Sequence, residues 1–115
     1  MEIKDSKFYR DKCYINGEWV NADSGETISV NNPANLKEIG TVPKCGTSET
    51  RNAIEAANNA WPEWRAKSAR QRSEILRKWF DLMIENKEEL AQIMTVEQGK
   101  PINESRGCLL YTSPS

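Results

Sequence analysis

A change of sequence period at Gly46 constrains the fold of this 115-residue chain more than any other feature. Before Gly46, short runs of strand-forming residues alternate with turn residues. After Gly46, apolar side chains recur every three or four residues, which is the period of an amphipathic helix. The sequence therefore predicts an α+β chain, in which a short antiparallel meander is followed by several helices.

The meander is predicted from its turns. Asn16-Gly17 favours a type I′ hairpin, because that turn requires a positive φ at both central residues. Strand-forming side chains flank this dipeptide on both sides. Two further strands are expected at residues 27–30 and 38–42, and Pro43 should end the second, since proline cannot donate a hydrogen bond to a sheet.

The helices after Gly46 are predicted from the residues that cap or begin them. Ser or Asn three residues before Gln or Glu is the spacing of a capping box, and an acidic residue suits the first turn. Proline also suits the first turn. The expected starts are Thr47 with Glu49 in the first turn, Pro62 for a short helix, Ser68 with Gln71, and Asn86 with Glu89.

The helix that begins near Ser68 carries an apolar face that is too wide for a helix covered on one side only. We therefore expect this helix to have partners on two sides. The residues of the face are Ile75, Leu76, Trp79, Phe80, Leu82, Met83 and Ile84.

The following helix has a sharp predicted end in the segment E-Q-G-K-P at residues 97–101. Gly99 can adopt a left-handed conformation without steric cost, and Pro101 prevents the helix from continuing in the same register. Residues 102–107 then predict the start of a further helix.

Composition and charge exclude several classes of function. The net charge is −1, from 16 Lys+Arg against 17 Asp+Glu, so there is no overall basic excess for nucleic acid or an anionic membrane. The sequence contains no histidine, no Gly-rich phosphate loop and no apolar run of the length that spans a membrane. The first residues lack a hydrophobic signal core, so we expect a cytoplasmic protein.

The cysteines Cys13, Cys45 and Cys108 are odd in number and share no metal-ligand spacing. We interpret them as reduced thiols rather than as a disulfide framework. Cys13 and Cys45 are expected to act as small apolar residues in or beside strands.

Residues 108–115, C-L-L-Y-T-S-P-S, abandon the preceding pattern. This octapeptide resembles the translation of a sequencing adaptor, and we interpret it as a non-native tail. A native flexible tail is the alternative. We expect the octapeptide to pack on nothing, apart from chance contacts by Leu109 or Leu110.

Across residues 8–107, several segments occur in the order found in the aldehyde dehydrogenase superfamily, which the chain resembles. Within that superfamily, residues 31–35, 76–80 and 94–98 are most similar to bacterial-type succinate-semialdehyde dehydrogenases. The segments that carry the resemblance are I-N-G-E-W at 15–19, N-P-A at 32–34, a helix through Ala53, Ala56 and Ala57, Trp64, Arg72, Leu76, E-L-A at 89–91 and E-Q-G-K-P at 97–101.

The resemblance implies that residues 1–107 are the N-terminal part of a Rossmann-like cofactor-binding domain, in which these helices cover a parallel sheet. Members of the family attack an aldehyde with a cysteine thiolate and pass hydride to NAD or NADP. A glutamate-activated water then hydrolyses the resulting thioester. The whole enzyme is thus expected to be a homodimer or homotetramer that oxidises a small aldehyde. The resemblance to succinate-semialdehyde dehydrogenases implies that this aldehyde is succinate semialdehyde.

The family's catalytic cysteine, glutamate and cofactor segments lie later than the residues of this chain. The resemblance therefore implies no catalytic and no cofactor-binding residue in the chain, which we expect to bind neither NAD nor NADP and to be inactive when isolated. The alternative class of protein is a self-contained α+β interaction module without chemistry, whose wide apolar helix face is a docking surface.

One metal site is implied by the resemblance. Some family members hold a monovalent cation with the carboxylate at the position that matches Glu97 and a backbone carbonyl at the position that matches Asn31. Ligation by oxygen atoms alone suits a hard cation such as sodium or potassium. The alternative is that Glu97 is a helix-surface carboxylate that caps or pairs.

Overall fold

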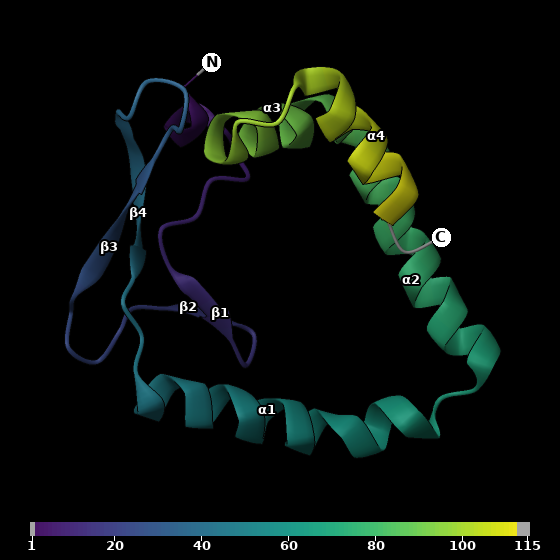
Figure 1. Cartoon of the computed structure of the whole chain (residues 1–115). Coiled ribbons are helices and arrows are strands. Elements are labelled where there is room, and N and C mark those ends of the chain that lie inside the picture. The colour runs from purple at the N-terminus through teal and green to yellow at the C-terminus, as the bar shows by residue number, and fades with distance from the viewer. Residues whose placement is uncertain (1, 113–115) are drawn as a thin grey trace.

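The computed structural model describes residues 2–112 and confirms the predicted α+β class. Short antiparallel strand pairs come first in the chain, and helices follow (Figure 1). The elements are a 3₁₀ turn η1 (Ile3–Asp5), strands β1 (Cys13–Ile15), β2 (Glu18–Val20), β3 (Thr27–Asn31) and β4 (Glu38–Pro43), and helices α1 (Thr47–Ala66), α2 (Ala69–Glu85), α3 (Lys87–Gln98) and α4 (Ile102–Thr112).

The strands form two separate hairpins rather than one continuous meander. β1 pairs with β2, and β3 pairs with β4, both antiparallel. Asn16 and Gly17 have φ angles of 53° and 78°, which confirms the predicted turn between β1 and β2. The link from β2 to β3 turns away from the first hairpin, because the Asp23 backbone N–H donates to the Glu49 carboxylate at the start of α1.

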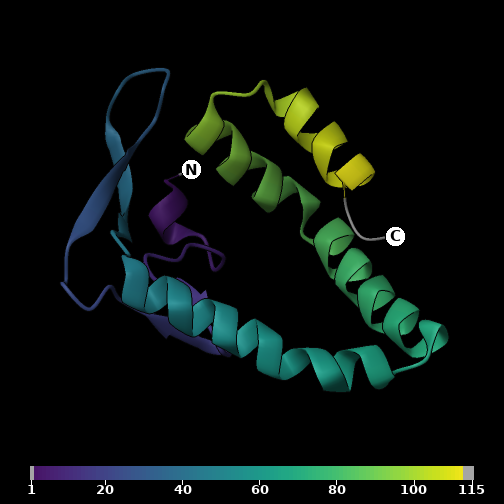
Figure 2. The ribbon, with the colours of Figure 1, turned by 60° about the horizontal axis from the view of Figure 1, so that its bottom comes forward.

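The helices form the sides of an open frame rather than a compact layer. In Figures 1 and 2, α1 and α2 are two long sides, α3 returns toward the strands, and α4 lies against α3. The radius of gyration is 16.6 Å, and the extents are 48 × 37 × 19 Å. A compact chain of this length would have a radius of gyration of about 13 Å.

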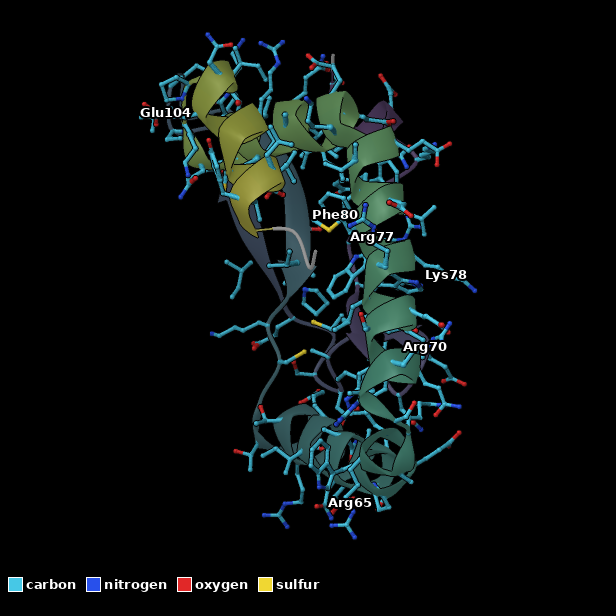
Figure 3. The ribbon with its side chains drawn as sticks, turned by 90° about the vertical axis from the view of Figure 1, so that its right-hand side faces the viewer. Arg65, Arg70, Arg77, Lys78, Phe80 and Glu104 are labelled. Atoms are coloured by element: carbon cyan, nitrogen blue, oxygen red, sulfur yellow. The ribbon has the colours of Figure 1, made fainter. Side chains whose placement is uncertain are left out.

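The hydrophobic core of this frame is small. Within the part of the chain that the structure describes, the buried apolar residues are Ile3, Ala22, Ala91 and Leu109, and α2 has no buried residue. Trp79 and Leu82 on α2 are each 57% exposed. Figure 3 shows Phe80 and Lys78 on opposite sides of α2. The partners expected for the wide apolar face are therefore not supplied by these residues.

Two of the predicted helix starts need correction. The N-cap of α1 is Gly46 rather than Thr47, and its N–H donates to the Glu49 Oε2 at 2.9 Å. The short helix predicted to begin at Pro62 is wrong, because Pro62 lies inside α1. Proline lacks one N–H but has a helical φ, so the helix continues for one more turn to Ala66.

The two predicted capping boxes have different outcomes. The box at Ser68 is confirmed: the Ser68 N–H donates to Gln71 Oε1 at 2.9 Å, and the Gln71 N–H donates to Ser68 Oγ at 3.2 Å. The box at Asn86 is wrong, because the Asn86 side chain donates back to the Leu82 carbonyl at 2.8 Å. Asn86 ends α2 and also begins α3, so its amide bonds to the helix that it ends.

The predicted further helix is confirmed as α4, but it continues into the octapeptide as far as Thr112. Leu109 is only 5% exposed. It is therefore buried more completely than the chance contact expected of it would produce. Ile102, Ser105 and Leu109 share one helix face, so an apolar residue at position 109 faces the neighbouring helices whatever its origin. The non-native origin of residues 108–115 stays a prediction, and residues 113–115 lie outside the described part.

The longest helices of the described chain are amphipathic and rich in charge. None of the helices in residues 2–112 combines the length and the apolar character needed to cross a membrane.

Candidate cation site at the junction of the Asn-Pro turn and the helix stop

Two of the sequence motifs meet at the end of α3. Gly99 has a φ of 77°, and its N–H donates to the Thr95 carbonyl at 2.8 Å, which confirms the predicted left-handed helix stop. A Cβ atom placed on Gly99 would lie 2.9 Å from Pro33 Cγ. Glycine is therefore required at this position for two reasons, the left-handed backbone conformation and the close approach of the Asn-Pro turn.

The Asn-Pro turn is held by the side chain and backbone of Asn32. The Asn32 Oδ1 accepts from the Ala34 N–H at 2.9 Å, which is an Asx turn. The Leu36 N–H donates to the Asn32 carbonyl at 2.7 Å, and Leu36 has a φ of 61°. These bonds fix the end of β3, where a bulge lies between Val30 and Asn31.

Glu97 lies in the last turn of α3, close to this end of β3. Glu97 and Val30 line the same hollow of about 610 Å³, whose other walls are Gln98 and apolar side chains of α2, α3 and α4. Glu97 and Asn31 are both exposed. The structure thus places Glu97 and Val30, the residue that precedes Asn31, on the wall of one hollow.

The donor set at this junction has the chemistry of a monovalent cation site. A single carboxylate and backbone carbonyls are hard oxygen ligands with a low total charge, which suits sodium or potassium. Across residues 2–112, no group of three or more His, Cys, Asp or Glu residues is gathered for a metal ion. The assignment of Glu97 and Asn31 therefore stays a prediction.

Two carboxylates with lowered pKa values lie elsewhere and hold elements together. Backbone N–H groups of Asp23 and Gly46 donate to the Glu49 carboxylate and lower its pKa. Arg106 donates to both carboxylate oxygens of Glu88, at 2.9 and 2.7 Å, and lowers the pKa of Glu88. These contacts join α1 to the strands and α4 to α3, so they are structural rather than catalytic.

Sequence reasoning missed a contact between two cysteines. The Sγ atoms of Cys13 and Cys45 lie 3.6 Å apart, although the residues are 32 positions apart in the chain. No local pattern marks this pair, because the contact depends on how the first hairpin packs beside the start of α1.

The expectation that this chain binds neither NAD nor NADP stays a prediction. Such a cofactor binds across the carboxyl ends of parallel strands, with its phosphates at a helix N-terminus. The described strands are paired only in antiparallel hairpins. The N-terminus of α1 holds the Glu49 carboxylate, and the first turn of α3 carries Glu88 and Glu89, so negative charge lies at these two helix starts.

Comparison with known proteins gives one family. Residues 19–113 match the model of the aldehyde dehydrogenase family. The chain is 57% identical over 113 residues to the glutarate-semialdehyde dehydrogenase of Pseudomonas putida, which covers 98% of this chain and 24% of that protein. It is 51% identical over 113 residues to the succinate-semialdehyde dehydrogenase [NADP(+)] of Escherichia coli, which covers 98% of this chain and 23% of that protein.

Solved structures agree with this result. The crystal structure of succinate-semialdehyde dehydrogenase from Burkholderia pseudomallei has a TM-score of 0.91 and 51% sequence identity, and covers 96% of this chain and 23% of that one. The chain thus spans about a quarter of the length of the relatives that it matches.

Proposed function

Because the chain belongs to the aldehyde dehydrogenase family, we propose that it is the N-terminal part of an enzyme that oxidises an aldehyde bearing a distal carboxylate. The observation that supports this proposal is the identity of 57% and 51% to two semialdehyde dehydrogenases over 98% of the chain. NAD or NADP would accept the hydride in the whole enzyme. The segment itself supplies two hairpins and four helices that pack on the rest of the domain.

The substrate is proposed to be succinate semialdehyde, with glutarate semialdehyde as the alternative that the Pseudomonas putida relative suggests. The two differ by one methylene, and both carry a carboxylate at the end remote from the aldehyde. Later segments of the enzyme should therefore supply arginines that bind this carboxylate in bidentate fashion.

Steady-state assays of the full-length protein test the substrate. We expect kcat/KM for the two semialdehydes to exceed that for a neutral aldehyde of similar length by about 100-fold or more, because unpaired arginines in the site would penalise the neutral substrate. The succinate and glutarate compounds should differ by about 10–200-fold, since they differ by one methylene. If a neutral aldehyde gave the highest kcat/KM, the proposed substrate would be wrong, whereas the family assignment would stand.

The structural roles of individual residues can be tested in a chimera. In it, residues 1–107 of this chain replace the matching segment of the Pseudomonas putida glutarate-semialdehyde dehydrogenase, to which the chain is 57% identical. The family assignment predicts that this chimera folds and is active. Failure to assemble, with the unaltered relative active in parallel, would contradict it.

We infer that Glu97 and the Asn31 carbonyl hold sodium or potassium. In the chimera, replacing tetramethylammonium chloride by KCl at equal ionic strength is then expected to raise the Tm by about 2–4 °C through binding to the folded state. Glu97→Gln should remove most of this difference. Glu104→Gln, which alters an exposed carboxylate on α4 (Figure 3), is the matched control. Equal Tm differences in both variants would exclude the site.

The lowered pKa of Glu49 predicts an acid-sensitive contact between α1 and the strands. Its folded-state pKa is below the ordinary value of 4.5, so the stabilisation is present above that pH and is lost as the pH falls through the folded pKa. Thermal unfolding of the chimera between pH 7 and about pH 3 should show a smaller loss of Tm in Glu49→Gln, whose Tm at pH 7 is already reduced. The exposed Glu55→Gln on the same helix should retain the full pH dependence.

We also infer that the native sequence departs from this chain after Gly107, since residues 108–115 resemble translated adaptor. Resequencing the locus from uncut DNA tests this. Codons for Cys108 to Ser115 in the genome would show that the octapeptide is native.

A further inference from the structure

Cys13 and Cys45 come from different elements and meet at one junction. Cys13 is the first residue of β1, and Cys45 lies between the end of β4 and the N-cap of α1. Their Sγ atoms are 3.6 Å apart. A disulfide bond has an S–S distance of about 2.05 Å, so the sulfurs must approach by about 1.5 Å, which side-chain rotation can supply.

The backbones on both sides of this pair are anchored. Cys13 pairs with Val20 in the first hairpin, and the chain that leaves the hairpin is bound to Glu49 through the Asp23 N–H. Glu49 in turn accepts from Gly46, which directly follows Cys45. The same carboxylate therefore joins the chain after β2 to the chain beside Cys45, which keeps the two thiols close together.

The tip of the hairpin adds a second contact with α1. Asn16 and Gly17 line a depression whose other wall is the alanine face of α1, formed by Ala53, Ala56, Ala57 and Ala60. Cys45 is exposed and Cys13 is partly exposed, so a small reagent can reach the pair from solvent.

We propose that Cys13 and Cys45 form a reversible disulfide that fastens the β1–β2 hairpin to the start of α1. The oxidant is a small disulfide such as oxidised glutathione. The Cys45 thiolate attacks one sulfur of the small disulfide and expels a thiolate, which leaves a mixed disulfide on Cys45. The Cys13 thiolate then attacks Cys45 Sγ and expels the second thiolate, so two cysteine thiols lose two electrons and two protons, and one small disulfide becomes two thiols.

The surroundings of Cys45 set the conditions for the experiment. Partial desolvation of the sulfur, its contact with Cys13, and the nearby carboxylates of Glu49 and Asp23 raise the pKa of the Cys45 thiol. Because the thiolate is the nucleophile, exchange should be faster at about pH 8.5 than at pH 7. The incubation is therefore made at the higher pH.

The test incubates the whole 115-residue chain with oxidised glutathione and then maps it with trypsin after alkylation. Cleavage after Lys12, Lys37, Lys44 and Arg51 isolates residues 13–37 and 45–51, each with one cysteine. We expect these two peptides joined, with a loss of about 2 Da and three free thiols reduced to one. Cys13→Ser and Cys45→Ser should each abolish the joined peptide, whereas Cys108→Ser should leave it.

The chimera keeps the test decisive if the isolated chain does not hold its fold. In the folded chimera, we expect at least about tenfold more of the joined peptide than in the same protein unfolded in guanidinium chloride, because the fold raises the effective concentration of one thiol at the other. Equal yields in the folded and unfolded protein would overturn the proposal. Glutathione adducts on Cys45 without the joined peptide, or a bond between two chains, would overturn it as well.

Discussion

The isolated 115-residue chain is expected to show no dehydrogenase activity and no sharp cooperative melt. The large side chains that a whole domain would cover are open to solvent in this chain: Trp79 and Leu82 are each 57% exposed, Ile54 is 64% exposed and Trp61 is 50% exposed. Leaving one such side chain uncovered forfeits about 1.5–3 kcal/mol of stabilisation. Several of them together remove a large share of the roughly 5–15 kcal/mol that stabilises a folded domain.

Three measurements check this prediction. The chain should bind a dye that reports exposed apolar surface, should aggregate on heating, and should give no activity with any aldehyde under conditions where the chimera is active. A soluble monomer with a cooperative melt above about 60 °C would contradict the prediction and favour the self-contained interaction module. The chimera is the matched control, because it contains residues 1–107 of this chain and the remainder of the domain, which is expected to cover the apolar face of α2.

Gly99→Ala should destabilise the chimera strongly, because it combines backbone strain with a steric clash. Alanine would hold the strained left-handed φ of 77° and would also place its Cβ 2.9 Å from Pro33 Cγ. The backbone strain costs about 1–2 kcal/mol, and the forced contact adds about 1–3 kcal/mol, because the Asn-Pro turn must move. We expect a total loss of about 2–5 kcal/mol, measured as a lowered Tm.

Two other glycines separate the causes. Gly25 has a φ of 73°, but a Cβ there would meet nothing within 4 Å, so Gly25→Ala should show the backbone strain alone. Gly107 lies in α4 without a positive φ and also has open space, so Gly107→Ala should be neutral or stabilise by up to about 1 kcal/mol. A Gly99→Ala loss no larger than that of Gly25→Ala would show that the contact with Pro33 carries no cost.

Features governed by neighbouring residues can be read from the sequence. The structure confirms the hairpin at Asn16-Gly17, the capping box at Ser68 and the left-handed stop at Gly99. Each depends on the φ preference of glycine and asparagine, or on a side chain that reaches a backbone group three residues away. The tertiary environment cannot easily override such short-range preferences, so sequence reasoning about them is sound.

Features for which several hydrogen-bond partners compete cannot be read in this way. The side chains of Asn86 and Glu89 have the spacing of a capping box, but Asn86 bonds to Leu82 and Glu89 accepts from Ser6 Oγ at 2.6 Å. A local pattern offers a hydrogen bond without excluding a better one, so a partner brought close by packing can replace it.

The candidate sites show the same division. The resemblance to the family implies that Glu97 and Asn31 share a site, which stays a prediction, and the structure places Glu97 and Val30 on the wall of one hollow. The approach of Cys13 to Cys45 across 32 residues has no signal in the sequence at all. The two cysteines approach each other only when the first hairpin packs on α1. Closing a loop of this length depends on all the contacts between the hairpin and the helix, and not on either cysteine alone.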